Sequence, residues 1–581
     1  MLGLFGGLAA VPATAATGPK MVRVGAHFFY VQQTLVPNGC AWGIGIVFGS
    51  VPGAASYLVT YWDGYYKRVE SATISAGQLV PATFHKNAKI WPKEPIAAGS
   101  HQLGVTGGTN SDDCGTAAGD PTEGGRFSKG AKAYAVFATG YKPPLADGLD
   151  WTMPPRLTGP PNGPEGLPTL REIDPTSWQA SVFLTSKGLP AICSGDVRWK
   201  WEVKPPKGAK LISGQPKPGC SFKLEGSKLG SYAATATPQH LRKGKWVTAG
   251  KVMSEPVVLK DYVIVGLGDS NGSGEGNPPF YYDTCNRSTA SYQYQAALYV
   301  ENQDPRSSVT FLHDSCSGAR LDHLVSTPYG GTRPGVTLRP QIPQISTDLS
   351  ALGTARHVDA VIISAGVNDL AFGPILAFCI NAAVTNPNTP CEELPVVPTL
   401  DSAHRINGWT QDYGTTPSLR DRLATLQGEL LGRYGPVASA LTRSVQSGGL
   451  GVSAKDVFIT QYPDFTNGDN GAPCGPTGLA RFGTSTWTWL GQNAAILNRT
   501  VAKAAASHGW TLIPIDSQAF ATRGYCSSHS LFVGIASAVA GFDVAGPFHP
   551  NAEAHLIEAA PLEPRLCEGL GLSATCESKK P

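Results

Sequence analysis

Four continuous apolar runs, separated by helical segments, most strongly limit what the second half of this chain can fold into. The runs are Tyr262–Val265, Val358–Ile363, Val457–Thr460 and Trp510–Ile515. A run without polar alternation is expected of a strand that is buried on both faces, as in a parallel sheet. Helical patterns lie between the runs, for example at 288–300 and 417–431. Strands that alternate with helices predict a doubly wound α/β domain after Leu259.

The first half of the chain predicts β structure instead. Residues 17–141 contain short aromatic and β-branched runs such as Tyr57–Trp62, divided by turn residues, which is typical of a fibronectin III-like sandwich. Residues 169–260 contain the strictly alternating run Val197–Val203, and we expect an immunoglobulin- or PKD-like β domain there. Between these regions, the segment 142–168 holds eight prolines, which favours a semi-rigid, extended spacer.

The twelve cysteines predict disulfides and an oxidising compartment, because their number is even and no C-x-x-C pair occurs. A set of buried, unpaired thiols is the alternative. Residues 1–16 are apolar with small residues at Ala13 and Ala15, as in a signal peptide, but without its basic start, so we expect a truncated signal; a short buried strand is the other interpretation. No later run reaches the ~18 apolar residues of a membrane span. The sequence therefore predicts a secreted protein, with a C-terminal tail at 567–581.

Composition excludes several classes of protein. A net charge of +3, taken as thinly spread, provides no nucleic-acid footprint. The 68 glycines and 47 prolines follow no G-X-Y repeat, which excludes collagen, and 41% hydrophobic residues are enough to form packed cores. With no H-E-x-x-H motif and no spaced set of ligands, no metal or cofactor is expected.

Four polar motifs lie at the ends of successive predicted elements, where open α/β sheets bind their ligands. They are Gly268-Asp269-Ser270, Asp314–Ala319, Ser364–Asp369 and Phe548–Asn551. A serine nucleophile needs a general base, and the oxyanion formed by its attack needs fixed hydrogen-bond donors. A serine, a glycine amide, an asparagine side chain and a histidine supply all of these groups, so the sequence predicts acyl-transfer chemistry.

These motifs make the chain similar to the GDSL-type SGNH hydrolases, and in particular to the secreted actinobacterial branch with suberin-esterase-like enzymes and lipases. The resemblance covers residues 261–566, about half of the chain, and includes the extension Ser273–Gly276 and the pair His549-Pro550. It implies a flavodoxin-like SGNH catalytic domain in which Ser270 is the nucleophile and His549 its general base. It also implies an oxyanion hole made by the Ser270 amide, the Gly318 amide and the Asn368 side chain.

The resemblance further implies three disulfides between neighbouring cysteines. These are Cys285–Cys316, Cys379–Cys391 and Cys474–Cys526. The remaining cysteines would then pair locally as Cys40–Cys114, Cys193–Cys220 and Cys567–Cys576. The sequence by itself establishes none of these pairings.

One position departs from the family pattern. Many members carry an aspartate three residues before the histidine, which orients its ring. Here that position is Gly546, and the nearest acid is Asp543. Either Asp543 reaches the ring or a backbone carbonyl near Gly546 accepts from it, and we favour the second arrangement, a Ser–His dyad.

Residues 268–272 also fit G-x-S-x-G, the nucleophile elbow of α/β-hydrolases, but that interpretation leaves the Gly318 and Asn368 motifs unexplained. The apolar stretch Leu531–Ile535 is expected either to line an acyl pocket or lid or to pack in the core. Packing or surface roles are expected for the other histidines near the motifs, namely His313, His323 and His555.

The sequence thus predicts a monomeric, secreted carboxylic-ester hydrolase that works through an acyl-enzyme. A short-chain ester, a lipid, a polyester and an acylated polysaccharide all suit this chemistry as substrates, and the sequence does not choose among them, because specificity resides in loops. The two β domains are expected to act as a spacer or an attachment module. The alternatives are an adhesive or substrate-binding protein with an idle hydrolase domain, and an acyltransferase that uses the same residues.

Overall fold

The structure is a computed structural model. It describes residues 22–24, 26–36, 39–49, 56–63, 68–75, 80–81, 100–110, 133–139, 146–161, 163–186, 189–190, 197–248, 250–333, 335–353, 355–402, 404–476, 480–540, 546–573 and 576. The predicted signal segment 1–16 lies outside the described residues, as do Cys114, Cys193 and Asp543.

Among the described residues from 22 to 139, antiparallel strands form two four-stranded sheets. The first has the order β1 (Val22–Val24), β8 (Ala133–Thr139), β4 (Ser56–Asp63) and β5 (Arg68–Ser75). The second has the order β2 (Ala26–Val36), β3 (Gly39–Gly49), β7 (Ser100–Asn110) and β6 (Val80–Pro81). Antiparallel pairing agrees with an all-β region, whereas the fibronectin III-like type stays a prediction.

The segment expected to be an extended spacer differs from that expectation. Residues Gly148–Thr152 form strand β9, which pairs with β10 (Trp178–Ser186), and β10 in turn pairs with β11 (Leu189–Pro190) and β13 (Ser221–Gly226). Beyond β9, Leu157 is only 8% exposed and joins the core of the α/β domain, and the Met153 amide donates to the Pro305 carbonyl at 2.8 Å. In the described part of this segment, Pro154 and Pro155 are exposed, while the apolar side chains of Leu149, Met153, Leu157 and Leu167 are buried.

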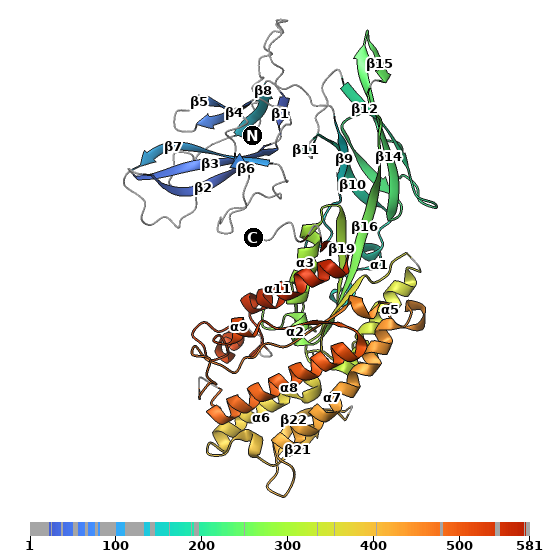
Figure 1. The fold of residues 1–581 in the computed structure, drawn as a ribbon. Coiled ribbons are helices and arrows are strands. Elements are labelled where there is room, and N and C mark those ends of the chain that lie inside the picture. Colours follow the sequence, from blue (N-terminus) through green and yellow to red (C-terminus); the bar gives the residue numbers. More distant parts are fainter. Residues whose placement is uncertain are drawn as a thin grey trace, which may run out of the picture.

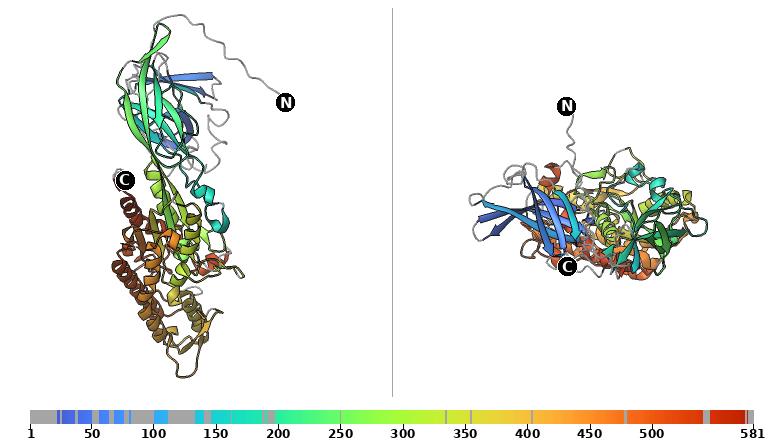
Figure 2. Two further views of the ribbon diagram at one scale, coloured as in Figure 1. Left: turned by 90° about the vertical axis from the view of Figure 1, so that its right-hand side faces the viewer. Right: turned by 90° about the horizontal axis from the view of Figure 1, so that it is seen from above.

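A single long strand joins the second β region to the α/β domain (Figure 1). Strand β16 (Met253–Gly268) pairs antiparallel with β14 (Gly230–Arg242) up to Leu259 and then parallel with β19 (Ser307–His313). From Ile264 it also pairs parallel with β20 (Ala360–Ser364). The predicted boundary between residues 260 and 261 therefore falls inside one strand. Figure 2 shows the β9–β16 region and the α/β domain end to end.

The α/β domain is built on a parallel sheet, as the sequence predicts. The strand order is β19–β16–β20–β23–β24, with β23 at Val457–Thr460 and β24 at Thr511–Ile513. At the other end of the same sheet, β12 (Val197–Lys204) and β15 (Lys245–Thr248) pair with β14. Two further pairs are separate from it, β17 (Phe280–Tyr282) with β18 (Arg287–Ser288) and β21 (Val396–Leu400) with β22 (Ile406–Gln411).

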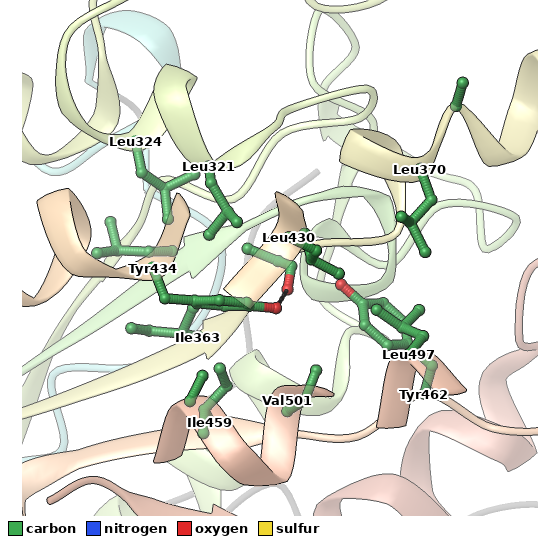
Figure 3. Close-up of a cluster of buried hydrophobic side chains, with 14 of the residues drawn as sticks. Leu321, Leu324, Ile363, Leu370, Leu430, Tyr434, Ile459, Tyr462, Leu497 and Val501 are labelled. Atoms are coloured by element: carbon green, nitrogen blue, oxygen red, sulfur yellow. Dashed lines mark hydrogen bonds between the residues drawn. The ribbon is translucent and has the colours of Figure 1, made fainter. Parts of the chain in front are cut away.

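Helices cover both faces of the parallel sheet, and alternate residues of β16 point to opposite faces. Tyr262 and Ile264 pack with α3 (Tyr292–Gln303) and α11 (Ala552–Gly569). Val263 and Val265 face a larger core with α4 (Leu321–Val325), α5 (Gln341–Ala351), α7 (Leu419–Thr442) and α8 (Thr484–His508). In Figure 3, Leu430 and Tyr434 of α7 and Leu497 and Val501 of α8 meet the strand residues Ile363 and Ile459.

Further helices are found among the described residues. They are α1 (Leu170–Ile173), α2 (Ser270–Ser273), α6 (Phe372–Thr385), α9 (Ser517–Phe520) and α10 (Ile535–Ala540). Disulfides join Cys285 to Cys316, Cys379 to Cys391, Cys474 to Cys526 and Cys567 to Cys576, which are the three pairings that the resemblance implies and one local pairing. Within the described part of the chain, no helix is long and apolar enough to cross a membrane.

Candidate active site

Ser270 stands at the carboxyl end of β16, where the strand turns into helix α2. The turn depends on Gly268, whose φ is +129° and whose position would place a Cβ only 1.8 Å from the Ser364 carbonyl oxygen. Only glycine permits this close approach of the ends of β16 and β20. The Asp269 amide then donates to the same Ser364 oxygen at 2.8 Å, which fixes the start of α2 beside β20.

The structure brings His549 to Ser270, although 279 residues separate them. The distance between His549 Nε2 and Ser270 Oγ is 2.8 Å, which is a hydrogen bond. The loop around His549 is held by its main chain, since the Val533 amide donates to the His549 carbonyl at 2.9 Å. In addition, Asn277 Nδ2 donates to the Pro550 carbonyl at 2.9 Å. The backbone of the loop that carries the imidazole is therefore fixed at His549 and Pro550.

The second ring nitrogen of this histidine has no acceptor among the described residues. His549 Nδ1 is buried and makes no hydrogen bond there, and the Gly546 carbonyl accepts instead from the His549 amide at 3.1 Å. The Gly546 carbonyl is thus not the acceptor that the dyad interpretation calls for. Asp543 lies outside the described residues, so the choice between a triad and a dyad stays open.

Gly318 and Asn368 line the same pocket as Ser270 and His549. Gly318 has a φ of +76°, a conformation that favours glycine, and no atom lies within 4 Å of the Cβ position there. Asn368 Nδ2 donates to the Ala319 carbonyl at 3.0 Å. This bond fixes the carboxamide beside the Gly318 loop and leaves its second N–H available. All four residues singled out in the sequence meet at one place.

The loop before Gly318 is fixed by a buried arginine, which the sequence did not reveal, and by a disulfide. Arg287, with 1% of its side chain exposed, donates to the Ser315 carbonyl at 2.8 Å and to Asp314 Oδ1 at 2.5 Å. The disulfide between Cys285 and Cys316 ties the same loop to the segment before Arg287. The bonds of Arg287 cross 27 and 28 residues, so no local pattern signals them, whereas the disulfide is one that the resemblance implied.

Glu275 holds the other side of this loop. Its buried carboxylate accepts from the Ser317 hydroxyl and, at 2.9 Å, from Asn286 Nδ2. Glu275 belongs to the Ser273–Gly276 extension of the family motif, but its partners are distant in sequence. Because Ser317 precedes Gly318, the carboxylate stabilises the position of the Gly318 amide.

Asp269, the residue before the nucleophile, is fully buried and supports the turn beneath it. Its carboxylate accepts from Ser364 Oγ at 2.9 Å and from the Tyr462 hydroxyl at 2.5 Å. Burial raises the pKa of Asp269 to about 7, against the lowering effect of these two hydrogen bonds. Asp269 therefore connects the start of α2 with the last residue of β20 and with Tyr462, which follows β23.

The other histidines near the motifs are buried, which favours packing roles over the surface roles that were also expected. His313 Nε2 lies 2.8 Å from the Gly272 carbonyl and Nδ1 lies 2.6 Å from the Tyr281 hydroxyl, and burial lowers the pKa of His313 to about 3. A neutral ring must donate to the carbonyl and accept from the tyrosine. His555 is fully buried and stacks on Tyr292. His323 is 4% exposed and accepts from the Arg320 amide.

The pocket that contains Ser270 extends between α6, α7 and α8 and has a volume of about 320 Å³. Away from Ser270 its lining is mainly apolar. The members include Leu370, Ile375, Leu423, Leu490, Ala494 and Leu497, with Phe465, Phe532 and Phe548 on another side. In the stretch Leu531–Ile535, Leu531 is fully buried and Phe532 lines the pocket, so this stretch both packs in the core and borders the site.

Comparison with known proteins adds similarity of structure only. No protein-family model matches the chain, and no curated protein sequence matches it. Among solved structures, it is similar to the acetylxylan esterase Axe2 from Geobacillus stearothermophilus, with 12% identity and a TM-score of 0.23, covering 53% of this chain and 94% of that one. A catalytic mutant of the same enzyme gives 11% identity, a TM-score of 0.25 and coverage of 54% and 96%. Both TM-scores are low, so the function is inferred below from this chain's own geometry.

Proposed function

We propose that this protein is a serine carboxylic-ester hydrolase of the SGNH type that forms an acyl-enzyme on Ser270. The observation that carries the proposal is the 2.8 Å contact between His549 Nε2 and Ser270 Oγ, in a pocket that Gly318 and Asn368 also line. A nucleophile within hydrogen-bond reach of a base, beside candidate oxyanion donors, is the arrangement that acyl transfer requires.

In the first half of the reaction, His549 Nε2 removes the Ser270 proton while Oγ forms a bond to the ester carbonyl carbon. The carbonyl π electrons move to its oxygen, and the negative charge faces the Ser270 and Gly318 amides and Asn368 Nδ2. When the tetrahedral intermediate collapses, the bond to the alcohol oxygen breaks and His549 gives that oxygen the proton. In the second half, His549 removes a proton from water while the water oxygen forms a bond to the acyl carbon. The bond from that carbon to Ser270 Oγ then breaks, His549 returns the proton to Oγ, and the free acid leaves.

The proposal extends to the compartment and the upstream regions. Four disulfides among the described cysteines support secretion, because disulfides persist in oxidising surroundings. We take the fibronectin III-like region at 17–141 and the immunoglobulin-like region at 169–260 as attachment modules, and the chain as a monomer that acts on an ester of a lipid, polyester or polysaccharide.

The nucleophile is tested by Ser270→Ala, which is expected to lower kcat by about 10⁴-fold or more without changing the melting temperature. A fluorophosphonate probe should label the wild type at Ser270 and leave the variant unlabelled. The matched control is Ser439→Ala on the exposed surface of α7, which should keep full labelling and turnover. A folded wild-type protein that refuses the probe would favour the binding-protein alternative. Ester products formed with a competing alcohol would favour the acyltransferase.

The role of Asp543 is tested by its change to Asn. We expect turnover to stay within about ten-fold of the wild type, because hydrogen bonds to the His549 and Pro550 carbonyls hold the loop, and Ser270 Oγ contacts the ring at Nε2, without Asp543. A loss of about 10⁴-fold would instead show that this carboxylate orients the ring. The pH profile of kcat/KM, measured for both proteins, separates a change in orientation from a change in folding.

A further inference from the structure

We infer that the pocket between α6, α7 and α8 takes the acyl chain of the ester, so that the substrates are esters of medium-length fatty acids and not acetyl esters. This inference rests on the proposed function, since it assigns the pocket relative to an acyl-enzyme on Ser270. It names the substrate class, which the catalytic geometry alone leaves open.

The distribution of polar groups in the pocket supports this assignment. At one end, Ser270, His549, Gly318 and Asn368 offer the groups that a carbonyl carbon and its oxygen need. Away from that end, the helices contribute aliphatic side chains such as Leu490. The carbonyl end of an ester therefore has polar partners, while the rest of the pocket matches a hydrocarbon.

The polar side chains in the helical part of the pocket are already bonded to other residues. Asn493 donates to the Trp489 carbonyl at 2.6 Å and accepts from Gln427 at 2.8 Å. The Tyr462 hydroxyl donates to Asp269. A sugar placed here would lose its hydrogen bonds to water without replacing them, whereas an acyl chain loses none. The acylated polysaccharide is thus disfavoured as the group inside the pocket, although it can still be the alcohol outside it.

The size of the pocket excludes an acetyl group as its natural occupant. A volume of about 320 Å³ is at the lower end of the range for sites that enclose drug-sized ligands. An acetyl group has one methyl to place there, and most of the apolar wall would stay in contact with water. Each further methylene that leaves water for this wall should raise kcat/KM by about four-fold until the pocket is filled.

The walls are rigid enough to set a chain-length limit. Helix α6, which contributes Phe372, Gly373 and Ile375, is joined to the segment before β21 by the disulfide between Cys379 and Cys391. Figure 3 shows Leu370 close to Tyr462 and Leu497, three members of the lining that are fixed in the core between the sheet and α8. A chain longer than the pocket therefore has to displace packed side chains, which costs free energy.

The test is a series of kcat/KM values for p-nitrophenyl esters from acetate to palmitate, measured on the full chain. The kcat/KM of the wild type should rise by about four-fold for each added methylene and reach its maximum at a medium chain length. A maximum at acetate would overturn the inference, as would a flat profile. If these esters are hydrolysed but Ser270→Ala is as active as the wild type, the proposed function itself fails, so the two failures are distinguishable.

Two adjacent alanines of α8 provide a plugging variant and its control. Ala494 lines the pocket, whereas Ala495 is exposed and lies outside it. Ala494→Leu should lower the octanoate-to-acetate ratio of kcat/KM by at least about ten-fold, because the added carbons occupy the space of two or three methylenes. Ala495→Leu changes the same helix identically and should leave the ratio unaltered. Equal ratios in both variants would contradict the inference.

Gly373→Leu is a second plug in case Ala494→Leu does not fold. No atom lies within 4 Å of the Cβ position at Gly373, so a side chain has room there. Because Pro374 follows, the new residue has a reduced preference for helical backbone, and this variant is therefore the second choice. It should shorten the preferred chain in the same way, and an unchanged chain-length profile would overturn the assignment.

Discussion

The β region before residue 260 and the α/β domain after it use the same strand in opposite ways. In the first part of β16, only Val257 and Leu259 are buried and their neighbours are exposed, because one face of that sheet meets solvent. From Asp261 to Gly268 every residue is buried, because helices cover both faces. The comparison teaches that a change from alternating to continuous apolar residues marks a change of environment and does not require a break in the strand.

The two regions also differ in charge, which corrects the expectation of a thin, even distribution. Residues 197–260 contain 13 Lys or Arg and only three Asp or Glu, in a chain whose net charge is +3. The rest of the chain is therefore net negative. The cations lie mostly on exposed positions of the β region, such as Lys200 and Lys204 of β12, while the catalytic pocket is nearly uncharged.

A cluster of ion pairs at the junction provides the strongest test of how the two regions are coupled. Asp261, buried in β16, pairs with Arg356 at 2.5 Å and with Arg156 at 3.1 Å. Asp261→Ala leaves the Arg356 guanidinium, 2% exposed, without its carboxylate, and should lower the free energy of unfolding by about 3–5 kcal/mol. Urea unfolding should still show one transition for residues 148–572, since β16 belongs to both regions.

The control for this variant is Glu255→Ala on the exposed half of the same strand, which should change stability by less than about 0.5 kcal/mol. Two separate transitions, of which only one responds to Asp261→Ala, would mean that the two regions unfold independently.

The dependence of stability on pH tests a second contact between the two regions, the one that Glu301 makes. Glu301 of α3 accepts from the Val309 amide at 2.7 Å and from the Leu157 amide at 3.3 Å, and burial raises the pKa of Glu301 to about 7. Because this folded pKa is above the unfolded value, the folded protein binds more protons than the unfolded chain. The contribution of Glu301 to the free energy of unfolding is therefore full below the unfolded pKa of about 4.5 and is lost as pH rises through 7.

Glu301→Gln removes this ionisation. We expect the variant to lose less stability than the wild type between pH 5 and pH 8, by an amount on the order of 1–3 kcal/mol. Denaturant unfolding at the two pH values measures it. Identical slopes with pH in both proteins would contradict the raised pKa. Burial also raises the pKa values of Asp269 and Asp314. Both residues are present in the wild type and in the variant, so their contributions to the pH dependence cancel in the difference.

The smallest expected effect lies wholly within the β region. The Arg198 guanidinium lies 4.1 Å from the centroid of the Trp246 ring. Trp246→Ala should therefore cost about 1 kcal/mol or less and leave ester hydrolysis unchanged. A fall in kcat with this variant would show that the β region takes part in turnover and would weaken the division between the two regions.

Much of the α/β domain was predictable because its signals are local. Continuous apolar runs gave the parallel strands, and the motifs at their carboxyl ends placed Ser270 and Asn368 at one edge of the sheet. The packed state of residues 148–168 was not predictable, since eight prolines in 142–168 masked the apolar residues Met153 and Leu157 between them. The clamp of Arg287 on Asp314 was equally hidden, because a distant ion pair leaves no periodic pattern.

Strand β16 also determines the distance between the Ser270 pocket and any ligand that the β region binds. Its 16 residues, at roughly 3.3 Å each, make a rod about 50 Å long. A flexible tether of the same length would sample many separations and directions, and its end would meet the pocket only as one of many arrangements. A hydrogen-bonded strand gives one separation and one direction. If the β region is bound to a surface, the distance of Ser270 from that surface is therefore set by the strand.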